Sequence, residues 1–367
     1  MKRSWVRSGF KVFLINALVF IAAVLLLEGL ASTVLVLKRL WKTAPLAERL
    51  HTRYDSELGW SNIPNAAVKD IFGPGVDVVI NSQGFRNDRD FSPVQPPGKV
   101  RVMCVGDSYT FGYGVSQEQG WCGKLHSLET RLEPVNMGQG GYGIDQAYLW
   151  YRRDGGKLEH RLTLLAVVSV DLERMMADEF LGYAKPKLVV EDGRLLITNV
   201  PVPRQAYLLP WTTTLYQGHF QELRTVALFH SWFPPKEQQH STIDPAARDA
   251  ILVKLMEDLA KIARERGSGL AVVYLPSAPD YRPDAATDGK RMALAQAAAQ
   301  HAVPYIDLVP EFRQVPASSV RDLFINKTTT TYPGAEGHYN VSGNWYIAQV
   351  LYRKLLGTPQ LSSILPQ

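Results

Sequence analysis

The sequence has little cysteine, since only Cys104 and Cys122 occur among its 367 residues. They do not form a CxxC pair, and no set of cysteines and histidines has the spacing of a zinc site. No pattern for a nucleotide or flavin is visible, so we predict neither a metal nor a cofactor. Cys104 lies in the apolar run Val102–Val105. This placement favours a buried thiol and leaves a Cys104–Cys122 disulfide open.

The sequence also lacks a strong excess of charge of one sign. Its formal net charge is +5, and its basic residues do not gather into a stripe with interleaved aromatic residues. This distribution argues against nucleic acid as a partner. Glycine and proline are present in ordinary amounts, and no internal repeat is evident. The length and the 46% hydrophobic composition fit one large domain, or one domain with an appendage.

A long apolar run is present near the N-terminus, over Val12–Leu37. About 20 helical residues cross the hydrocarbon core of a bilayer, so this run is long enough for a transmembrane helix. A cleaved signal peptide, cut after Ala31, is the alternative. The length of the run and the basic residues that follow it favour a retained anchor. The bases of residues 1–11 predict a cytoplasmic N-terminus. The rest of the chain would then lie outside the cytoplasm, in the periplasm if the cell is Gram-negative.

Glu28 is the one ionisable residue inside this run. A charge within the bilayer is costly, so an acidic residue there needs a partner or a place near the interface. Two interpretations stay open. Glu28 lies near the outer interface, or it binds a partner helix in the membrane.

The remaining chain divides by composition. Residues 38–57 are predicted to form a polar, helical stalk. Residues 58–98 are rich in Gly, Pro, Asn and Asp, which predicts short strands and turns. Residues 99–357 form the main domain, with an insertion over about 178–244, and residues 358–367 form a tail. Within the insertion, Asp192-Gly193 predicts a hairpin between Lys187–Val190 and Arg194–Thr198.

Strand and helix patterns alternate through the main domain, which predicts a parallel sheet covered on both faces. The predicted strands are Val100–Val105, Glu133–Met137, Leu162–Val170, Gly269–Leu275 and Pro304–Leu308. The predicted helices are Gln117–Arg131, Ile144–Arg153, Pro245–Arg266, Gly289–His301 and Val341–Leu356.

The first of these strands leads into Gly106-Asp107-Ser108. Ligands bind beyond the carboxyl ends of the strands in an open parallel sheet, so the first strand places Ser108 where a ligand would bind. Its backbone N–H could also stabilise an oxyanion. A turn or a helix cap would explain the same three residues, so this motif is weak alone.

Two further motifs strengthen the assignment. The glycine-rich loop Gly138–Gly143 follows the next strand, and glycine lets the backbone approach a substrate oxygen closely. Glu336-Gly337-His338 precedes the last helix. A histidine can take the proton of a serine hydroxyl, while a nearby carboxylate holds the ring's tautomer.

In this order the motifs resemble the SGNH/GDSL hydrolase superfamily, over roughly residues 55–356. Asn81–Arg86 and Thr110–Val115 extend the resemblance to its membrane-anchored bacterial branch. The resemblance implies a three-layer α/β/α sandwich with a flavodoxin-like parallel sheet. It also implies Ser108 as the nucleophile, Ser108 and Gly141 as oxyanion donors, and His338 as the base.

Two positions depart from the family pattern. The family's third block supplies an Asn as oxyanion donor, and Val170 stands at that position here. Loss of one such donor costs about 10²–10³ in rate. Ser169 could replace it, whereas a structural or substrate-binding role suits Asp171 better. The family also has Asp before its His, where this chain has Glu336. A Ser–His dyad held by a backbone carbonyl is the alternative. Asp107 and Asn340 are further candidates for lining the site.

The leading functional hypothesis is an ester hydrolase that removes acyl groups, such as O-acetyl, from an envelope or secreted glycan. An O-acyltransferase with the same acyl-enzyme chemistry is the first alternative. It is favoured if the 178–244 insertion excludes water. A non-catalytic glycan-binding or scaffold protein is the second alternative, and the missing Asn is its best support.

Overall fold

The computed structural model describes residues 2–42, 50–181, 183–203, 224–233, 244–330 and 332–366. The chain divides into two units. The first comprises Met1–Thr43 with Gln205–Thr242, and the second comprises Ala44–Arg204 with Ile243–Gln367. Each unit is described by itself.

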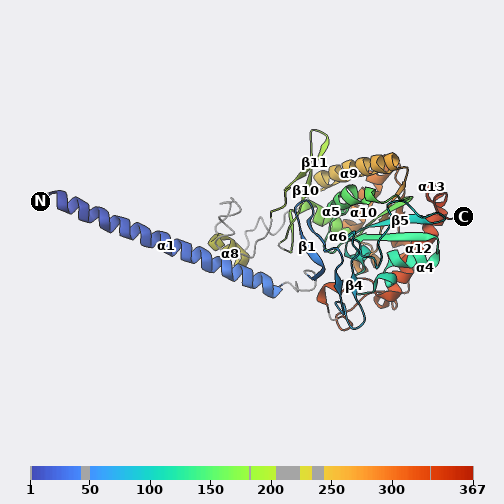
Figure 1. The fold of residues 1–367 in the computed structure, drawn as a ribbon, viewed down its shortest axis with the longest axis horizontal. Helices are drawn as coiled ribbons and strands as arrows, with labels where there is room; N and C mark the ends of the chain where they lie inside the picture. Colours follow the sequence, from blue (N-terminus) through green and yellow to red (C-terminus); the bar gives the residue numbers. More distant parts are fainter. Residues whose placement is uncertain are drawn as a thin grey trace. The chain divides into compact units, whose positions relative to one another are not determined.

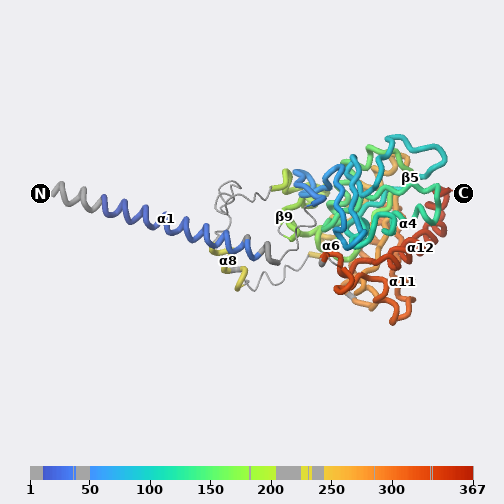
Figure 2. Tube along the Cα trace, turned by 60° about the horizontal axis from the view of Figure 1, so that its bottom comes forward, coloured from blue at the N-terminus to red at the C-terminus, as the bar shows by residue number. Residues whose placement is uncertain are grey.

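The first unit contains two described helices, α1 (Lys2–Lys42) and α8 (Arg224–Trp232). The apolar part of α1, Lys11–Leu35, reaches a mean hydropathy of 2.5 and is long enough to cross a membrane. By length and composition it fits a single-pass anchor and a signal sequence alike. α8 lies beside the C-terminal part of α1 (Figures 1 and 2).

The second unit is built on a parallel sheet of five strands. They are β5 (Val100–Gly106), β6 (Leu132–Gly138), β7 (Leu162–Val167), β12 (Gly269–Tyr274) and β13 (Tyr305–Asp307). The order across the sheet is β13-β12-β7-β5-β6, with every neighbouring pair parallel. Numbered along the chain, this is the flavodoxin-like order 2-1-3-4-5. The predicted α/β class and flavodoxin-like sheet are therefore confirmed.

Helices cover both faces of this sheet (Figure 1). On one face pack α5 (Ile144–Asp154), α9 (Pro245–Arg266) and α10 (Ala285–Gln300), and on the other pack α4 (Trp121–Leu128) and α12 (Val341–Gly357). β5 contributes side chains to the hydrophobic cores on both faces of the sheet. Met103 and Val105 join the first core, whereas Val102 and Cys104 join the second. Alternate residues of a strand face opposite sides, so a strand buried on both faces is apolar throughout.

Short antiparallel hairpins lie outside the sheet. β1 (Thr52–Asp55) pairs with β2 (Gly59–Asn62), and β3 (Ala67–Val68) pairs with β4 (Val78–Val79). In the insertion, β8 (Glu179–Phe180) pairs with β9 (Tyr183–Ala184). The predicted hairpin is also present there, as β10 (Lys187–Glu191) with β11 (Arg194–Thr198).

The structure corrects two predicted elements. The helical stalk does not reach residue 57, because Thr52–Asp55 pairs with β2, and residues 43–49 lie outside the described part. The third strand does not reach Val170 either. It ends at Val167, and α6 (Ser169–Met176) begins there, because the Asp171 carboxylate accepts the Val168 N–H at 3.0 Å and caps the helix. In the predicted tail, α13 (Pro359–Ser362) packs on the domain through the buried Leu361.

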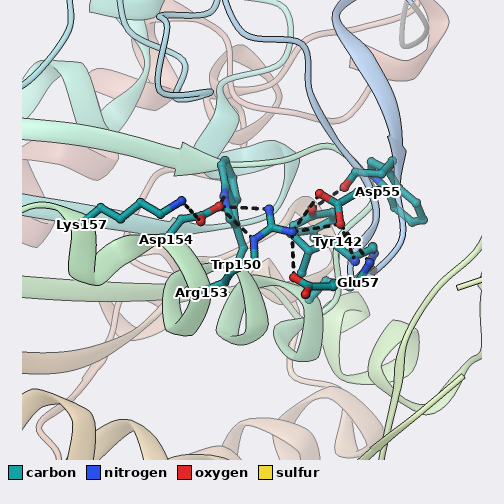
Figure 3. A network of polar contacts seen from close by, with 10 residues as sticks. Asp55, Glu57, Tyr142, Trp150, Arg153, Asp154 and Lys157 are labelled. Carbon is teal, nitrogen blue, oxygen red and sulfur yellow. Dashed lines mark hydrogen bonds and ion pairs between the residues drawn. The ribbon is translucent and has the colours of Figure 1, made fainter. Parts of the chain in front are cut away.

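An arginine at the end of α5 holds the β1–β2 hairpin in place (Figure 3). Arg153 Nη1 donates to both carboxylate oxygens of Asp55 at 2.9 Å and to Glu57 Oε2 at 3.2 Å. Arg153 also binds its neighbour Asp154. The hairpin is fixed to the sheet domain in this way, and it carries Trp60 towards the glycine-rich loop after β6.

Candidate active site

Ser108 lies where the sequence pattern predicted, directly beyond the carboxyl end of β5. It is the first residue of the short helix α3 (Ser108–Phe111). Asp107 caps this helix by accepting the Tyr109 N–H at 2.8 Å. Ser108 is buried, with 4% of its surface exposed, so its hydroxyl is fixed by its neighbours rather than by bulk water.

His338 is the principal neighbour of this hydroxyl. Its Nε2 lies 2.7 Å from Ser108 Oγ, and its Nδ1 lies 3.3 Å from the Ala335 carbonyl oxygen. A ring that donates from Nδ1 to a carbonyl leaves Nε2 free to accept the serine proton. Burial lowers the pKa of His338 to about 4, so the ring is neutral at ordinary pH. A neutral imidazole in this tautomer is the form that a general base needs.

The geometry gives no support to the predicted role of Glu336. Glu336 is exposed, and the bond from Nδ1 goes to the backbone of Ala335 instead. The intervening Gly337 has a φ of +81°, which turns the chain between the two side chains. These contacts fit the alternative arrangement, a Ser–His pair oriented by a backbone carbonyl.

Two tyrosines pack against the imidazole. The rings of Tyr109 and Tyr113 lie 4.6 Å and 5.3 Å from the His338 ring, centroid to centroid. The Tyr109 hydroxyl also donates to the Gly337 carbonyl at 2.9 Å. These contacts fix the ring plane and supply the apolar surroundings that keep His338 uncharged.

The predicted oxyanion donors are the backbone N–H groups of Ser108 and Gly141. Within the described residues, no hydrogen bond occupies either group. Gly141 has a φ of +77°, and a Cβ atom built there would lie 2.5 Å from the Phe180 ring. Trp60 Nε1 donates to the Gly140 carbonyl at 2.9 Å and holds the same loop. Gly141 is thus a position that favours glycine, for both conformation and space.

α6 carries the position where the family pattern has Asn. Val170 has no side-chain donor, so that oxyanion contact is absent from its side chain. Asp171 is buried, and burial together with the nearby Asp107 raises its pKa. Its carboxylate caps α6 and pairs with Arg174, with the Arg174 Nη1 to Asp171 Oδ1 distance at 3.0 Å. These contacts support the structural role among the two that the sequence left open for Asp171.

Arg174, which the sequence patterns did not indicate, lies one helical turn beyond Val170. Its Nη1 is 3.2 Å from Asp107 Oδ2, and that carboxylate oxygen is 3.3 Å from Ser108 Oγ. Burial opposes the charge of Arg174, but the carboxylates of Asp171 and Asp107 outweigh it and raise the pKa of Arg174. The guanidinium also lies over the Phe180 ring, 4.8 Å from its centroid. Arg174 therefore connects Asp107, the residue next to Ser108, to the Phe180 ring beside the glycine-rich loop.

Two other predicted site residues have structural partners. The Ser169 side chain acts on the hydroxyl of Tyr274 in β12, where it opposes part of the rise in the pKa of that tyrosine caused by burial. Asn340 caps α12, because its Oδ1 accepts the Gly343 N–H at 2.9 Å. Neither contact places the residue at the Ser108 hydroxyl. The expectation that Ser169 replaces the missing donor gains no support from these contacts, and a site-lining role for Asn340 gains none either.

Arg86 supports the loop that follows the nucleophile. It is fully buried and comes from the motif Asn81–Arg86. Its Nη1 donates to the Gly112 carbonyl at 2.6 Å, and its Nη2 donates to the Val115 carbonyl at 2.6 Å. One guanidinium therefore satisfies several carbonyls that the turn after α3 leaves without partners. This is a physical reason for the Asn81–Arg86 motif to accompany the Ser108 loop.

The two cysteines form a disulfide, which answers the question that the sequence left open. Cys104 on β5 and Cys122 on α4 are bonded, with their Cα atoms 6.2 Å apart. The bond ties the strand that ends at the nucleophile to a helix on one face of the sheet. Structural disulfides persist in oxidising compartments and are rare in the cytosol.

Several residues near the site were missed because they arrive from distant elements. Trp60 comes from β2, Phe180 from β8 and Arg174 from α6. No short motif contains them together, and only tertiary structure shows that they meet at the Gly138–Gly143 loop. The spacing of Val170 and Arg174, four residues apart on one helix, is the only local signal that could have suggested Arg174.

No family model matches the chain, and no curated protein sequence matches it. Among solved structures it is similar to a lipolytic protein of the G-D-S-L family from Desulfitobacterium hafniense, at 13% identity and a TM-score of 0.37, covering 70% of this chain and 99% of that one. It is also similar to an acetylxylan esterase from Geobacillus stearothermophilus, at 14% identity and a TM-score of 0.40, covering 70% and 93%. At these values the likeness assigns no residue a role.

Proposed function

We propose that this chain is a serine ester hydrolase of the SGNH kind, which removes acyl groups through an acyl-enzyme on Ser108. The 2.7 Å contact between Ser108 Oγ and His338 Nε2 carries the proposal. A serine hydroxyl becomes an effective nucleophile when a neutral imidazole accepts its proton. The Ala335 carbonyl holds that imidazole in the required tautomer.

The reaction follows from these contacts. Ser108 Oγ attacks the ester carbonyl carbon while its proton passes to His338 Nε2. The oxygen that becomes negative is bound by the N–H groups of Ser108 and Gly141. His338 then protonates the leaving alcohol oxygen, and the acyl group remains on Ser108. A water molecule, deprotonated by the same ring, then attacks the acyl carbon. The bond to Ser108 Oγ breaks, the ring returns the proton to that oxygen, and the acid is released.

A short acyl group, such as acetyl, is the substrate that we propose. The Phe180 ring occupies the space beside Gly141, where the carbonyl oxygen would be bound. Little room is left next to the oxyanion position for a long acyl chain.

We further propose that α1 anchors the chain in the cytoplasmic membrane, with the ester-hydrolysing unit outside the cytoplasm. The Cys104–Cys122 bond supports an oxidising compartment. An envelope or secreted glycan carrying O-acyl groups would be the substrate within reach there.

Acyl transfer to a sugar hydroxyl is the second candidate. The insertion supports it through Phe180, which covers the Gly141 loop next to Trp60, at 6.2 Å between the two ring centroids. Such apolar cover could slow the attack of water on the acyl-enzyme. Measuring how the acyl group divides between water and a glycan acceptor separates the two reactions, and transfer is excluded if the acceptor is never modified.

The test of the proposal is labelling with a serine-directed fluorophosphonate. The purified chain should form one adduct, on Ser108, and Ser108→Ala should form none. Ser108→Ala should also lose ester hydrolysis by about 10⁴-fold or more. A folded sample that forms no adduct on Ser108 would contradict the proposal.

A further inference from the structure

The first unit contains polar contacts between two segments that lie far apart in the sequence. Near the start of α8, the Thr225 N–H donates to Glu28 Oε1 at 3.1 Å, and the Thr225 hydroxyl also bonds that oxygen. Near its end, Lys38 Nζ donates to the Ser231 carbonyl at 2.9 Å and to its hydroxyl at 3.0 Å. α8 therefore runs parallel to the C-terminal part of α1 and beside it (Figure 1).

These contacts give Glu28 a partner within the same chain. The carboxylate accepts from an N–H in the first turn of α8 that has no acceptor within the helix. A helix carries partial positive charge at this end and favours an anion there. An acidic residue in an apolar helix is costly without such compensation. Glu28 thus serves as the attachment point of α8 on α1.

α8 and the residue that follows it also carry an exposed apolar stripe. Val226, Phe229, Trp232 and Phe233 are 39%, 57%, 57% and 63% exposed. The Phe229 and Phe233 rings pack on each other, with their centroids 5.1 Å apart. Two aromatic side chains on this nine-residue helix, with Phe233 directly after it, form an exposed apolar surface that water does not favour.

The position along α1 identifies what would cover this stripe. If the hydrocarbon core begins at Lys11, about 20 residues at 1.5 Å each bring its far boundary close to Ala31. Glu28 then lies just inside that boundary, and Lys38 lies about 10 Å outside it. α8 spans the same interval, which is the headgroup region where Trp and other amphipathic side chains concentrate.

We propose that α8 is a membrane-interface helix, docked on the outer end of α1 through Glu28, with its Val226–Phe233 stripe in the headgroup–acyl boundary of the bilayer. The proposal rests on the anchoring role of α1 proposed above. In that role the exposed apolar side chains of α1, including Leu27 and Leu30, must also meet lipid. Residues 224–233 contain no acidic residue, which suits an anionic lipid surface.

The experiment uses the full chain in vesicles of phosphatidylcholine with phosphatidylglycerol. Phe229→Cys is labelled with an environment-sensitive dye, because the two native cysteines are already paired. Phe20→Cys in the middle of α1 and Val94→Cys in the second unit are the matched controls, at exposed positions of 69% and 66%. Each label is challenged with lipids that carry a nitroxide near the headgroup and with iodide in the water.

The Phe229 label should be quenched by the lipid nitroxide. Its quenching by iodide should be at least about threefold weaker than that of the Val94 label. A Phe229 label that responds like the Val94 label, while the Phe20 label is quenched by lipid, overturns the proposal. A Phe229 label shielded from both quenchers also overturns it, because the stripe is then covered by a second copy of the chain. A Phe20 label that lipid does not quench indicates that α1 is not an anchor, which is a separate failure.

A second variant tests the attachment point. Glu28→Leu removes the acceptor for Thr225 without weakening the span, so lipid quenching at Phe229 should fall while quenching at Phe20 persists. Thr33→Val is the matched control, since the Thr33 hydroxyl bonds to Gly29 O of its own helix. Unchanged quenching at Phe229 in Glu28→Leu overturns the role of Glu28.

Discussion

At the level of single residues, the chemistry of His338 depends on how it is buried and held. Tyr109 and Tyr113 surround the ring, and the Ala335 carbonyl replaces the carboxylate that Glu336 was expected to provide. A dyad of this kind has no ionised partner to stabilise the imidazolium that forms during attack. The neighbouring charges of Asp107 and Arg174 act on the ring in opposite directions.

The pH dependence of hydrolysis should reflect this environment. Burial lowers the pKa of His338 from 6.5 to about 4, and only the neutral ring accepts a proton. We expect kcat/KM to stay constant through the mildly acidic range and to fall below about pH 4. Measuring kcat/KM against pH with an uncharged ester checks this.

The folded ring resists a proton that the unfolded ring binds. This difference makes the free energy of unfolding decrease as the pH falls from 6.5 towards 4, so folding is checked at each pH by circular dichroism. An acid limb near 6.5 would contradict the prediction.

Glu336→Gln tests whether the Glu336 carboxylate helps to orient the His338 ring. The exposed carboxylate does not hold the ring, so kcat should stay near that of the unchanged chain and the acid limb should not move. If the carboxylate did hold the ring, its loss would cost about 10⁴-fold in kcat. Steady-state kinetics on a short-chain ester decides between these outcomes.

Phe180 should set the acyl length that the site accepts. Phe180→Ala removes the ring beside Gly141, so the ratio of kcat/KM for butyryl over acetyl esters should rise by about tenfold or more. Tyr183→Ala is the control, because Tyr183 packs on Trp60, with ring centroids 6.2 Å apart, and belongs to the same hairpin. An unchanged ratio in Phe180→Ala would argue against the proposed acetyl preference.

At the level of elements, the site is positioned by strand ends and by the ties between them. The carboxyl end of β5 supplies Ser108, the loop after β6 supplies Gly141, and the turn before α12 supplies His338. The Cys104–Cys122 bond fixes β5 to α4, and the backbone N–H of Trp121 in α4 donates to the Oδ1 of Asn344 in α12 at 2.9 Å. The elements that carry Ser108 and His338 are therefore joined through α4.

Reducing this disulfide should lower the stability of the sheet unit. The bond closes a loop with a sequence separation of 18, for which the chain-entropy estimate is about 3 kcal/mol. Urea unfolding of the unchanged chain should shift to lower concentration in dithiothreitol. The double variant Cys104→Ala/Cys122→Ala should be less stable in both conditions and should not respond to dithiothreitol. Equal midpoints for the unchanged chain with and without reductant would contradict the prediction.

At the level of the whole molecule, the sequence predicted whatever depends on local pattern. Apolar strands separated by amphipathic helices gave the parallel sheet, and three short motifs led to Ser108, Gly141 and His338. The position of Glu336 could not be predicted, because a spacing of two residues does not fix where a side chain lies when a left-handed glycine stands between them. Arg174 and Phe180 could not be predicted, because they reach the loop only through tertiary packing. Thr52–Asp55 was misread as helix, since its partner strand decides its conformation.

The division of the chain into two units leads to the last prediction. Ser108, His338, Gly141, Phe180 and Arg174 all belong to the second unit, Ala44–Arg204 with Ile243–Gln367. The buried clusters on both faces of the sheet also belong to it. A variant that begins at Ala44 and replaces residues 205–242 with a flexible Gly–Ser linker should therefore fold without detergent. It should hydrolyse a soluble acetyl ester with kcat/KM close to that of the full chain, while losing its association with vesicles. Circular dichroism, ester kinetics and vesicle sedimentation measure the three properties. A folded variant that loses hydrolysis would show that the first unit contributes to the site itself, because no described residue of the proposed reaction lies there.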